Sequence, residues 1–225
     1  MNNPLSEPLV RKEGEYRDDR LFYIGCDDRY APDQYFGFFK MPRIKICMVP
    51  AADNLSHAHY VLEKLKPIKC EADDEKWMVL DTDHCTKDNH FESYEKALSE
   101  ARRLGIHIAI SCPCFEVWLA FHRSTVDEVV KLTTADACSK HLSEVANGYN
   151  KTKLRSDAFT IETLSDAYHR AATRDAEVAG GDKPDGVTTR VYRVWHNILL
   201  KALASQLPDS IRGLADEVKA SGRQY

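Results

Sequence analysis

The stretch Trp77–Asp83, which reads WMVLDTD, decides how the rest of the chain is interpreted. It begins as a short apolar run typical of a buried strand and ends on two carboxylates, Asp81 and Asp83. Residues two apart on an extended backbone project to the same side, so these carboxylates repel each other unless a cation lies between them. Their hard oxygen atoms suit Mg²⁺ or Mn²⁺. The simpler interpretation is that both aspartates only cap the turn that follows.

Other β-rich runs alternate with segments of helical spacing in the first half of the chain. The predicted strands beside Trp77–Leu80 are Leu21–Cys26, Ile44–Val49 and Ile106–Ile110. The predicted helices are Pro32–Lys40, Leu55–Leu65 with Asn54 as its cap, and Ser93–Leu104, which Gly105 ends. Strands that alternate with helices form a parallel sheet with right-handed crossovers. The sequence therefore predicts an α/β fold.

A second acidic pair follows the first predicted strand directly. Asp27 and Asp28 come after Leu21–Cys26, as Asp81 and Asp83 come at the end of the third strand. In a parallel sheet the carboxyl ends of the strands lie at one edge, which is where ligands bind. We therefore expect all four aspartates to gather there around one or two metal ions.

The second half is mostly helical in pattern. Helical spacing covers Thr125–Leu132, Thr134–Gly148 with Thr134 as cap, Ile161–Ala179 and Thr189–Leu207, and a short helix is expected from Asp209 within Pro208–Tyr225. Gly and Pro make residues 180–186 a connecting loop. The predicted organisation is a flexible N-terminal arm over residues 1–20, an α/β core over 21–122, and a helical region over 123–225 packed on that core.

Two longer segments resemble a known family. A strand that ends on an acid, followed by a later strand that ends on Asp-x-Asp, resembles the Toprim domain of topoisomerases, primases and some nucleases. The segments Val79–His84 and Ile108–His122 resemble RloB-like proteins, a Toprim-related family of bacterial defence loci. Tyr35-Phe36 and Thr188–Tyr192 fit the same family, so the resemblance spans roughly residues 20 to 200. It implies a Toprim-like parallel sheet flanked by helices.

The chain departs from the family pattern after its first strand. The family places Glu-Gly there, whereas this chain has Asp27 and Asp28, and a later Thr-Glu pair is replaced by Ala31 and Pro32. Aspartate is one methylene shorter than glutamate, and distances matter in sites for hard ions. This departure keeps open a catalytically weak subunit that works by binding within a defence complex.

The predicted site also includes a glutamate, a histidine and three basic residues. Glu116 opens an apolar helix, where a carboxylate is costly unless it is paired or metal-bound, and it matches the Glu of the family segment; the alternative is an acidic helix-start residue. His84 could orient a ligand or a phosphate. The basic residues expected to contact phosphate are Lys151, Lys153 and Arg190, although such groups are more often a solvated face.

The resemblance implies metal-dependent phosphodiester hydrolysis. Catalysis is assigned to Asp27, Asp81, Asp83 and Glu116, and metal binding to Asp27, Asp28, Asp81 and Asp83. The implied substrate is DNA or structured RNA, including tRNA, and the implied partner is an ABC-type ATPase that holds the nuclease silent until phage infection. Besides the binding subunit, a phosphotransfer enzyme acting on a small nucleotide stays open, although the chain lacks a Walker-type loop.

Bulk properties favour a cytoplasmic protein. The chain has 225 residues, a net charge of −4, and no run long enough to cross a membrane. Its seven cysteines lack the paired spacing of a zinc site and are expected to be reduced. The acidic balance does not exclude nucleic acid, because bound cations would reverse it locally. A homo-oligomer remains compatible with the sequence.

Overall fold

The computed structural model describes residues 18–49, 57–83 and 91–225. Within these ranges the strands form a sheet in the order β2-β1-β3-β4-β5. Its parallel members are β1 (Arg20–Cys26), β2 (Ile44–Val49), β3 (Glu75–Asp81) and β4 (His107–Cys112). The predicted α/β fold is confirmed, and the ends of β1 and β3 lie on neighbouring strands.

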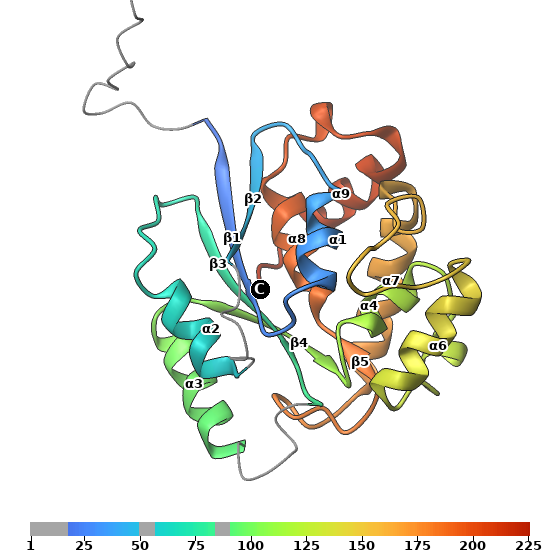
Figure 1. The fold of residues 1–225 in the computed structure, drawn as a ribbon. Coiled ribbons are helices and arrows are strands. Elements are labelled where there is room, and N and C mark those ends of the chain that lie inside the picture. The colour runs from blue at the N-terminus through green and yellow to red at the C-terminus, as the bar shows by residue number, and fades with distance from the viewer. Residues whose placement is uncertain (1–17, 50–56, 84–90) are drawn as a thin grey trace, which may run out of the picture.

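Helices cover both faces of the sheet, as Figure 1 shows. On one face lie α2 (Ala58–Leu65) and α3 (Phe91–Arg103), packed against Met78 and Leu80 of β3. Trp77 and Val79 alternate with them and face the other layer, which includes α1 (Ala31–Gly37) and α4 (Glu116–Phe121). By the same alternation Asp81 belongs to the α1 and α4 side. The predicted cap of α2, Asn54, lies outside the described residues.

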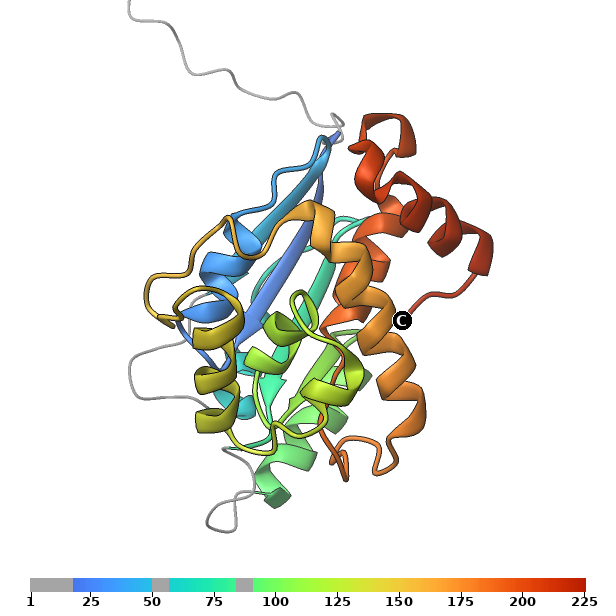
Figure 2. The same ribbon diagram turned by 90° about the vertical axis from the view of Figure 1, so that its right-hand side faces the viewer.

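The second half adds helices to that layer and one strand to the sheet (Figure 2). Its helices are α5 (Val126–Val129), α6 (Ala135–Val145), α7 (Ile161–Glu177), α8 (Val191–Lys201), the 3₁₀ helix η1 (Ala204–Gln206) and α9 (Asp209–Ser221). Thr134 caps α6 by accepting the Ala137 N–H, as predicted. The predicted helix Thr189–Leu207 was too long: it ends at Lys201, and η1 follows.

The strand β5 (Thr188–Thr189) was not predicted. It pairs antiparallel with the end of β4, where Ser111 lies opposite Thr189. Two residues carry no periodic signal, so only the neighbouring strand selects the extended conformation here. The consequence is that the C-terminal half contributes directly to the sheet edge that bears Asp81.

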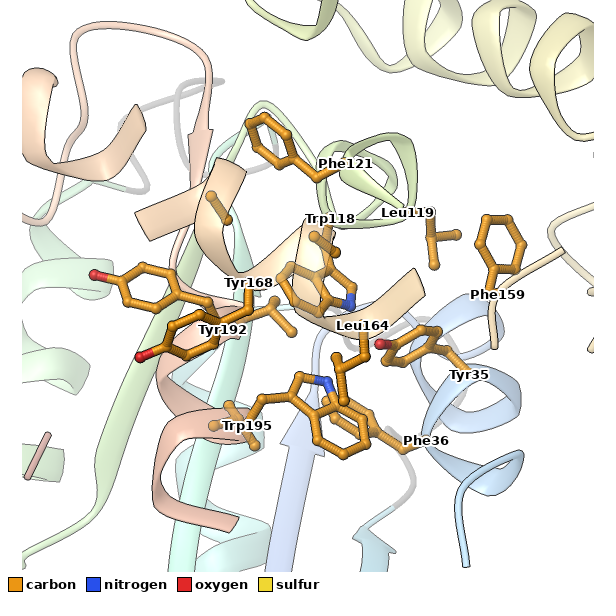
Figure 3. Close-up of a cluster of buried hydrophobic side chains, with 14 of the residues drawn as sticks. Tyr35, Phe36, Trp118, Leu119, Phe121, Phe159, Leu164, Tyr168, Tyr192 and Trp195 are labelled. Atoms are coloured by element: carbon orange, nitrogen blue, oxygen red, sulfur yellow. The ribbon is translucent and has the colours of Figure 1, made fainter. Parts of the chain in front are cut away.

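An aromatic cluster joins α1, α4 and α8 beneath that edge (Figure 3). The ring of Tyr35 meets Trp118 and Trp195 edge to face, with 6.2 Å between ring centroids in each case. Its hydroxyl shares a 2.9 Å hydrogen bond with His122 Nε2, and the other ring nitrogen of His122 lies 2.8 Å from Thr163 Oγ1. His122 is therefore a buried structural residue.

We expect the buried His122 to make stability fall in acid. Burial, together with the charges of Arg123 and Arg170, lowers the pKa of His122 to about 3. Between pH about 3 and 6.5 His122 is therefore protonated in the unfolded chain and neutral in the folded chain. The free energy of unfolding should drop by up to ~1.4 kcal/mol per pH unit as pH falls through that window. Urea unfolding of the wild type and His122→Asn from pH 4 to 7 checks this: equal pH slopes would contradict it.

None of the helices within the described ranges is both long and apolar enough to span a bilayer.

Candidate functional site

Two acidic strand ends meet at the carboxyl edge of the sheet. The carboxylate of Asp27, after β1, accepts the Asp81 N–H with Oδ2 and the Asp28 N–H with Oδ1, both at 2.9 Å. Asp81 ends β3, and Asp27 and Asp81 are buried. The side chain of one strand end is thus fixed to the backbone of the other. The predicted proximity of Asp27 and Asp81 is confirmed, whereas the metal ion expected among the aspartates stays a prediction.

The loop between β4 and α4 shapes the turn that carries Asp83. The Pro113 carbonyl accepts the Thr82 and Asp83 N–H groups, each at 3.1 Å, and the Thr82 N–H also lies 3.0 Å from the Ser111 carbonyl. The Cys112–Pro113 peptide bond is cis. The hydrogen bonds to the Pro113 and Ser111 carbonyls hold the half-buried Asp83 at the same edge as Asp81.

Glu116 joins the acidic group from α4. It is the first residue of that helix and is only 3% exposed. Its Oε1 accepts a 2.7 Å hydrogen bond from the hydroxyl of Tyr149, a residue that sequence analysis did not identify. The apolar side chains of α4, including Trp118 and Leu119, pack into the cluster of Figure 3 and place the helix so that the charge of Glu116 raises the pKa of Asp81.

Asp28 and Lys151 form the other half of the site. Asp28 Oδ1 accepts the Tyr30 N–H at 2.9 Å, while Oδ2 lies 3.1 Å from Lys151 Nζ. The same ammonium group is 4.0 Å from Glu116 Oε1. Lys151 was predicted to contact phosphate; the structure places it beside two buried carboxylates, with 43% of its side chain still exposed.

Buried carboxylates that lie close together raise one another's pKa values. Burial raises the pKa of Asp27 to about 8, with Asp28 and Asp83 contributing and the two backbone N–H groups opposing the shift. Burial, and then the charges of Asp27 and Glu116, hold the pKa of Asp81 well above its usual range. Each added negative charge in this low-dielectric edge is unfavourable, so the site favours a proton or a cation.

The donor set suits a hard divalent cation in its chemistry. Among the described residues Asp81 Oδ1 has no hydrogen-bond partner although it is buried, which is costly unless a ligand satisfies it. Within the same ranges no three His, Cys, Asp or Glu side chains converge as placed around one metal position. Binding would therefore require the carboxylates of Asp27, Asp81 and Asp83 to turn toward a common point.

Two further predicted site residues, Arg190 and Lys153, make no described contact with this group. Arg190 binds Asp175 Oδ1 at 3.0 Å, and Asp175 also holds Arg193 at 2.6 Å, so Arg190 is engaged in a structural ion pair. Lys153 is exposed on the loop of Lys151. His84 lies outside the described residues.

A hydroxyl pair borders the site and was also missed by sequence analysis. Ser111 lies opposite Asp81 in the β3–β4 register, and its Oγ is 2.8 Å from Thr189 Oγ1. Both residues are fully buried. Two polar residues in separate predicted elements gave no local signal, because only the antiparallel pairing of β5 brings them together.

Cys114 is not an activated nucleophile. A contact with Cys138 and burial raise the pKa of its thiol, and the carboxylates of Glu116 and Asp81 act in the same direction. Nucleophilic cysteines need the thiolate, which an electropositive surrounding favours. The acidic surroundings keep this thiol protonated.

Fold and site together define an α/β protein with carboxylates gathered at the ends of two neighbouring parallel strands. The sequence profile of the RloB-like protein family matches residues 22–198. The chain belongs to the RloB-like family. Neither curated proteins nor solved structures provide a significant match.

Proposed function

We propose that this protein is a metal-dependent nuclease that acts as the effector of an anti-phage defence system. The observation that supports this most is the hydrogen bond from the Asp81 N–H to Asp27, together with the buried, unpartnered Oδ1 of Asp81 within the described part of the chain. Acidic oxygens held together at a ligand-binding edge are what a divalent cation needs.

Asp27, Asp81 and Asp83 would hold Mg²⁺ or Mn²⁺, with Asp28 and Glu116 beside them. When bound, such an ion lowers the pKa of a water molecule and neutralises charge on a phosphodiester. The bonds from the Asp81 N–H to Asp27 and from the Thr82 and Asp83 N–H groups to Pro113 hold the strand ends together, so that the carboxylates would need only to turn toward the ion.

The substrate we propose is DNA or structured RNA, including tRNA, and the proposed partner is an ABC-type ATPase that restrains the nuclease. Family membership supports both parts of this proposal. The binding subunit remains the second candidate, and one observation favours it: as placed, no three acidic, His or Cys side chains within the described ranges surround a metal position.

A cleavage assay separates the two candidates. We expect the chain, without the proposed ATPase, to cut labelled single-stranded DNA, duplex DNA or tRNA in Mg²⁺ or Mn²⁺, and EDTA to abolish cutting. Asp83→Asn should lower the rate by at least about 10²-fold, because it removes a charge that the metal requires. Tight binding of these nucleic acids without any cutting, under every metal condition, would support the binding subunit.

A further inference from the structure

Lys151 occupies an unusual place for a lysine, because its ammonium group lies within the acidic site. It is 3.1 Å from Asp28 Oδ2 and 4.0 Å from Glu116 Oε1, and the side chains of both acids are nearly inaccessible. The lysine itself keeps 43% of its side chain exposed. This exposed part of the side chain marks the direction from which a substrate phosphate would approach Lys151.

The loop that carries Lys151 is fixed to the site at several points. Gln34 of α1 donates to the Lys151 carbonyl at 2.9 Å and accepts the Leu154 N–H at 2.8 Å. Tyr149 donates to Glu116, and Asn150 Oδ1 accepts the N–H of Thr152 at 2.9 Å. These bonds fix the backbone on both sides of Lys151, so its positive charge is in position before any ligand binds.

The ammonium group of Lys151 pairs with only part of the acidic group. Asp28 and Glu116 share Lys151, whereas the carboxylate of Asp27 accepts the backbone N–H of Asp81. The buried Asp81 Oδ1 lacks a hydrogen-bond partner among the described residues. A divalent ion placed beside Asp28 and Glu116 would be repelled by the ammonium already there.

We propose that Lys151 supplies the second positive charge of the active site, so that the chain binds a single divalent ion at Asp27, Asp81 and Asp83. This inference rests on the proposed nuclease function. In hydrolysis a water oxygen bonds to phosphorus as the bond to the leaving oxygen breaks, and that oxygen takes up a proton. Lys151 donates a hydrogen bond to the negative charge that develops on the phosphate and leaving oxygen. A compact ammonium suits this task because it concentrates its charge on one atom.

Metal stoichiometry tests the proposal independently of activity. The full-length chain is titrated with Mn²⁺ while free Mn²⁺ is followed by electron paramagnetic resonance. We expect one ion per chain for the wild type. Lys151→Ala should bind the first ion more tightly and admit a second beside Asp28 and Glu116. Lys140→Ala removes the same charge from an exposed position on α6 and should bind one ion, as the wild type does.

Kinetics at a Mn²⁺ concentration that fills only the first site complete the test. Lys151→Ala and Lys151→Gln should each cut about 10²–10³-fold more slowly, although both bind metal, while Lys151→Arg recovers part of the rate. Two ions on the wild type, or Lys151 variants with one ion at unchanged affinity, would overturn the proposal even if cutting occurs. A lower melting temperature with unchanged stoichiometry would do the same, because it marks a purely structural ion pair.

Failure of the nuclease function gives a different result. If the wild type binds one Mn²⁺ and Lys151→Ala binds two, but neither cuts any nucleic acid, the exclusion of a second ion by Lys151 is supported and the proposed nuclease function is rejected. If the wild type binds no Mn²⁺ at all, both proposals are overturned.

Discussion

Asp81→Asn is expected to abolish cleavage and to stabilise the metal-free protein at the same time. Asp81 lies buried beside Asp27 and Glu116, and its Oδ1 has no hydrogen-bond partner within the described ranges. Asparagine keeps the shape and removes the charge. We expect cutting to fall by at least about 10²-fold, since a metal ligand loses its charge. Removing the repulsion should raise the melting temperature by about 2–8 °C.

The stabilisation should grow with pH. The pKa of Asp81 is raised in the folded chain, so the folded protein keeps a proton that the unfolded chain releases first as pH rises. Stability is therefore lost above the unfolded pKa of about 4, and Asp81→Asn escapes that loss. Melting temperatures in EDTA at pH 5, 7 and 8 measure the difference between variant and wild type, and Mg²⁺ should reduce it.

Asp216→Asn is the matched control for this experiment. Asp216 is exposed on α9, far in sequence from the site, and its substitution should change neither cutting nor the pH trend. A variant Asp81→Asn that is less stable than the wild type at every pH would mean that Asp81 supports the fold rather than strains it. The functional assignment of Asp81 would then lose its main physical support.

Trp118→Ala is expected to cost about 3–5 kcal/mol of unfolding free energy, the usual range for a buried tryptophan replaced by alanine. Trp118 is fully buried and meets Tyr35 and His122 edge to face. It lies in α4, a helix of six residues, too short to be stable without its packing. Because α4 carries Glu116, the variant should also lose the geometry of the site.

Urea denaturation measures the loss, with two comparison variants. Trp118→Phe keeps an aromatic ring in the cluster of Figure 3 and should cost less than the alanine variant. Tyr60→Ala removes an aromatic ring from an exposed position on α2 and should stay within about 0.5 kcal/mol of the wild type. A loss below about 1 kcal/mol for Trp118→Ala would show that the cluster collapses around the gap and does not determine where α4 lies.

The position of the site was predictable because its two acidic strand ends can each be recognised from a short segment of sequence. Apolar runs that end on acids at residues 27–28 and 81–83 predict both the strands and the chemistry at their ends, and the alternation with helices predicts parallel pairing. The structure confirms that Asp27 and Asp81 meet. The metal, the substrate and the partner remain predictions, since the structure tests none of them.

The residues that complete the site were not predictable from local pattern. Tyr149 contacts a glutamate 33 positions earlier, and Lys151 pairs with an aspartate that lies far back at the end of β1. From the sequence alone, phosphate contact was predicted for Lys151, Lys153 and Arg190 because these residues are basic. Only the tertiary packing, in which α6 lies on α4 and Gln34 holds the loop after α6, distinguishes a lysine placed among carboxylates from one exposed to solvent.

The sequence by itself determined the α/β class, the parallel strands, the acidic strand ends and the resemblance to the family, because periodicity and residue type are properties of short segments. The tertiary structure alone decided that β5 closes the sheet edge, that Asp175 takes up Arg190, and that Lys151 enters the acidic site. These outcomes depend on which segments pack side by side. Burial and charge pairing act through space and leave no periodic mark along the chain.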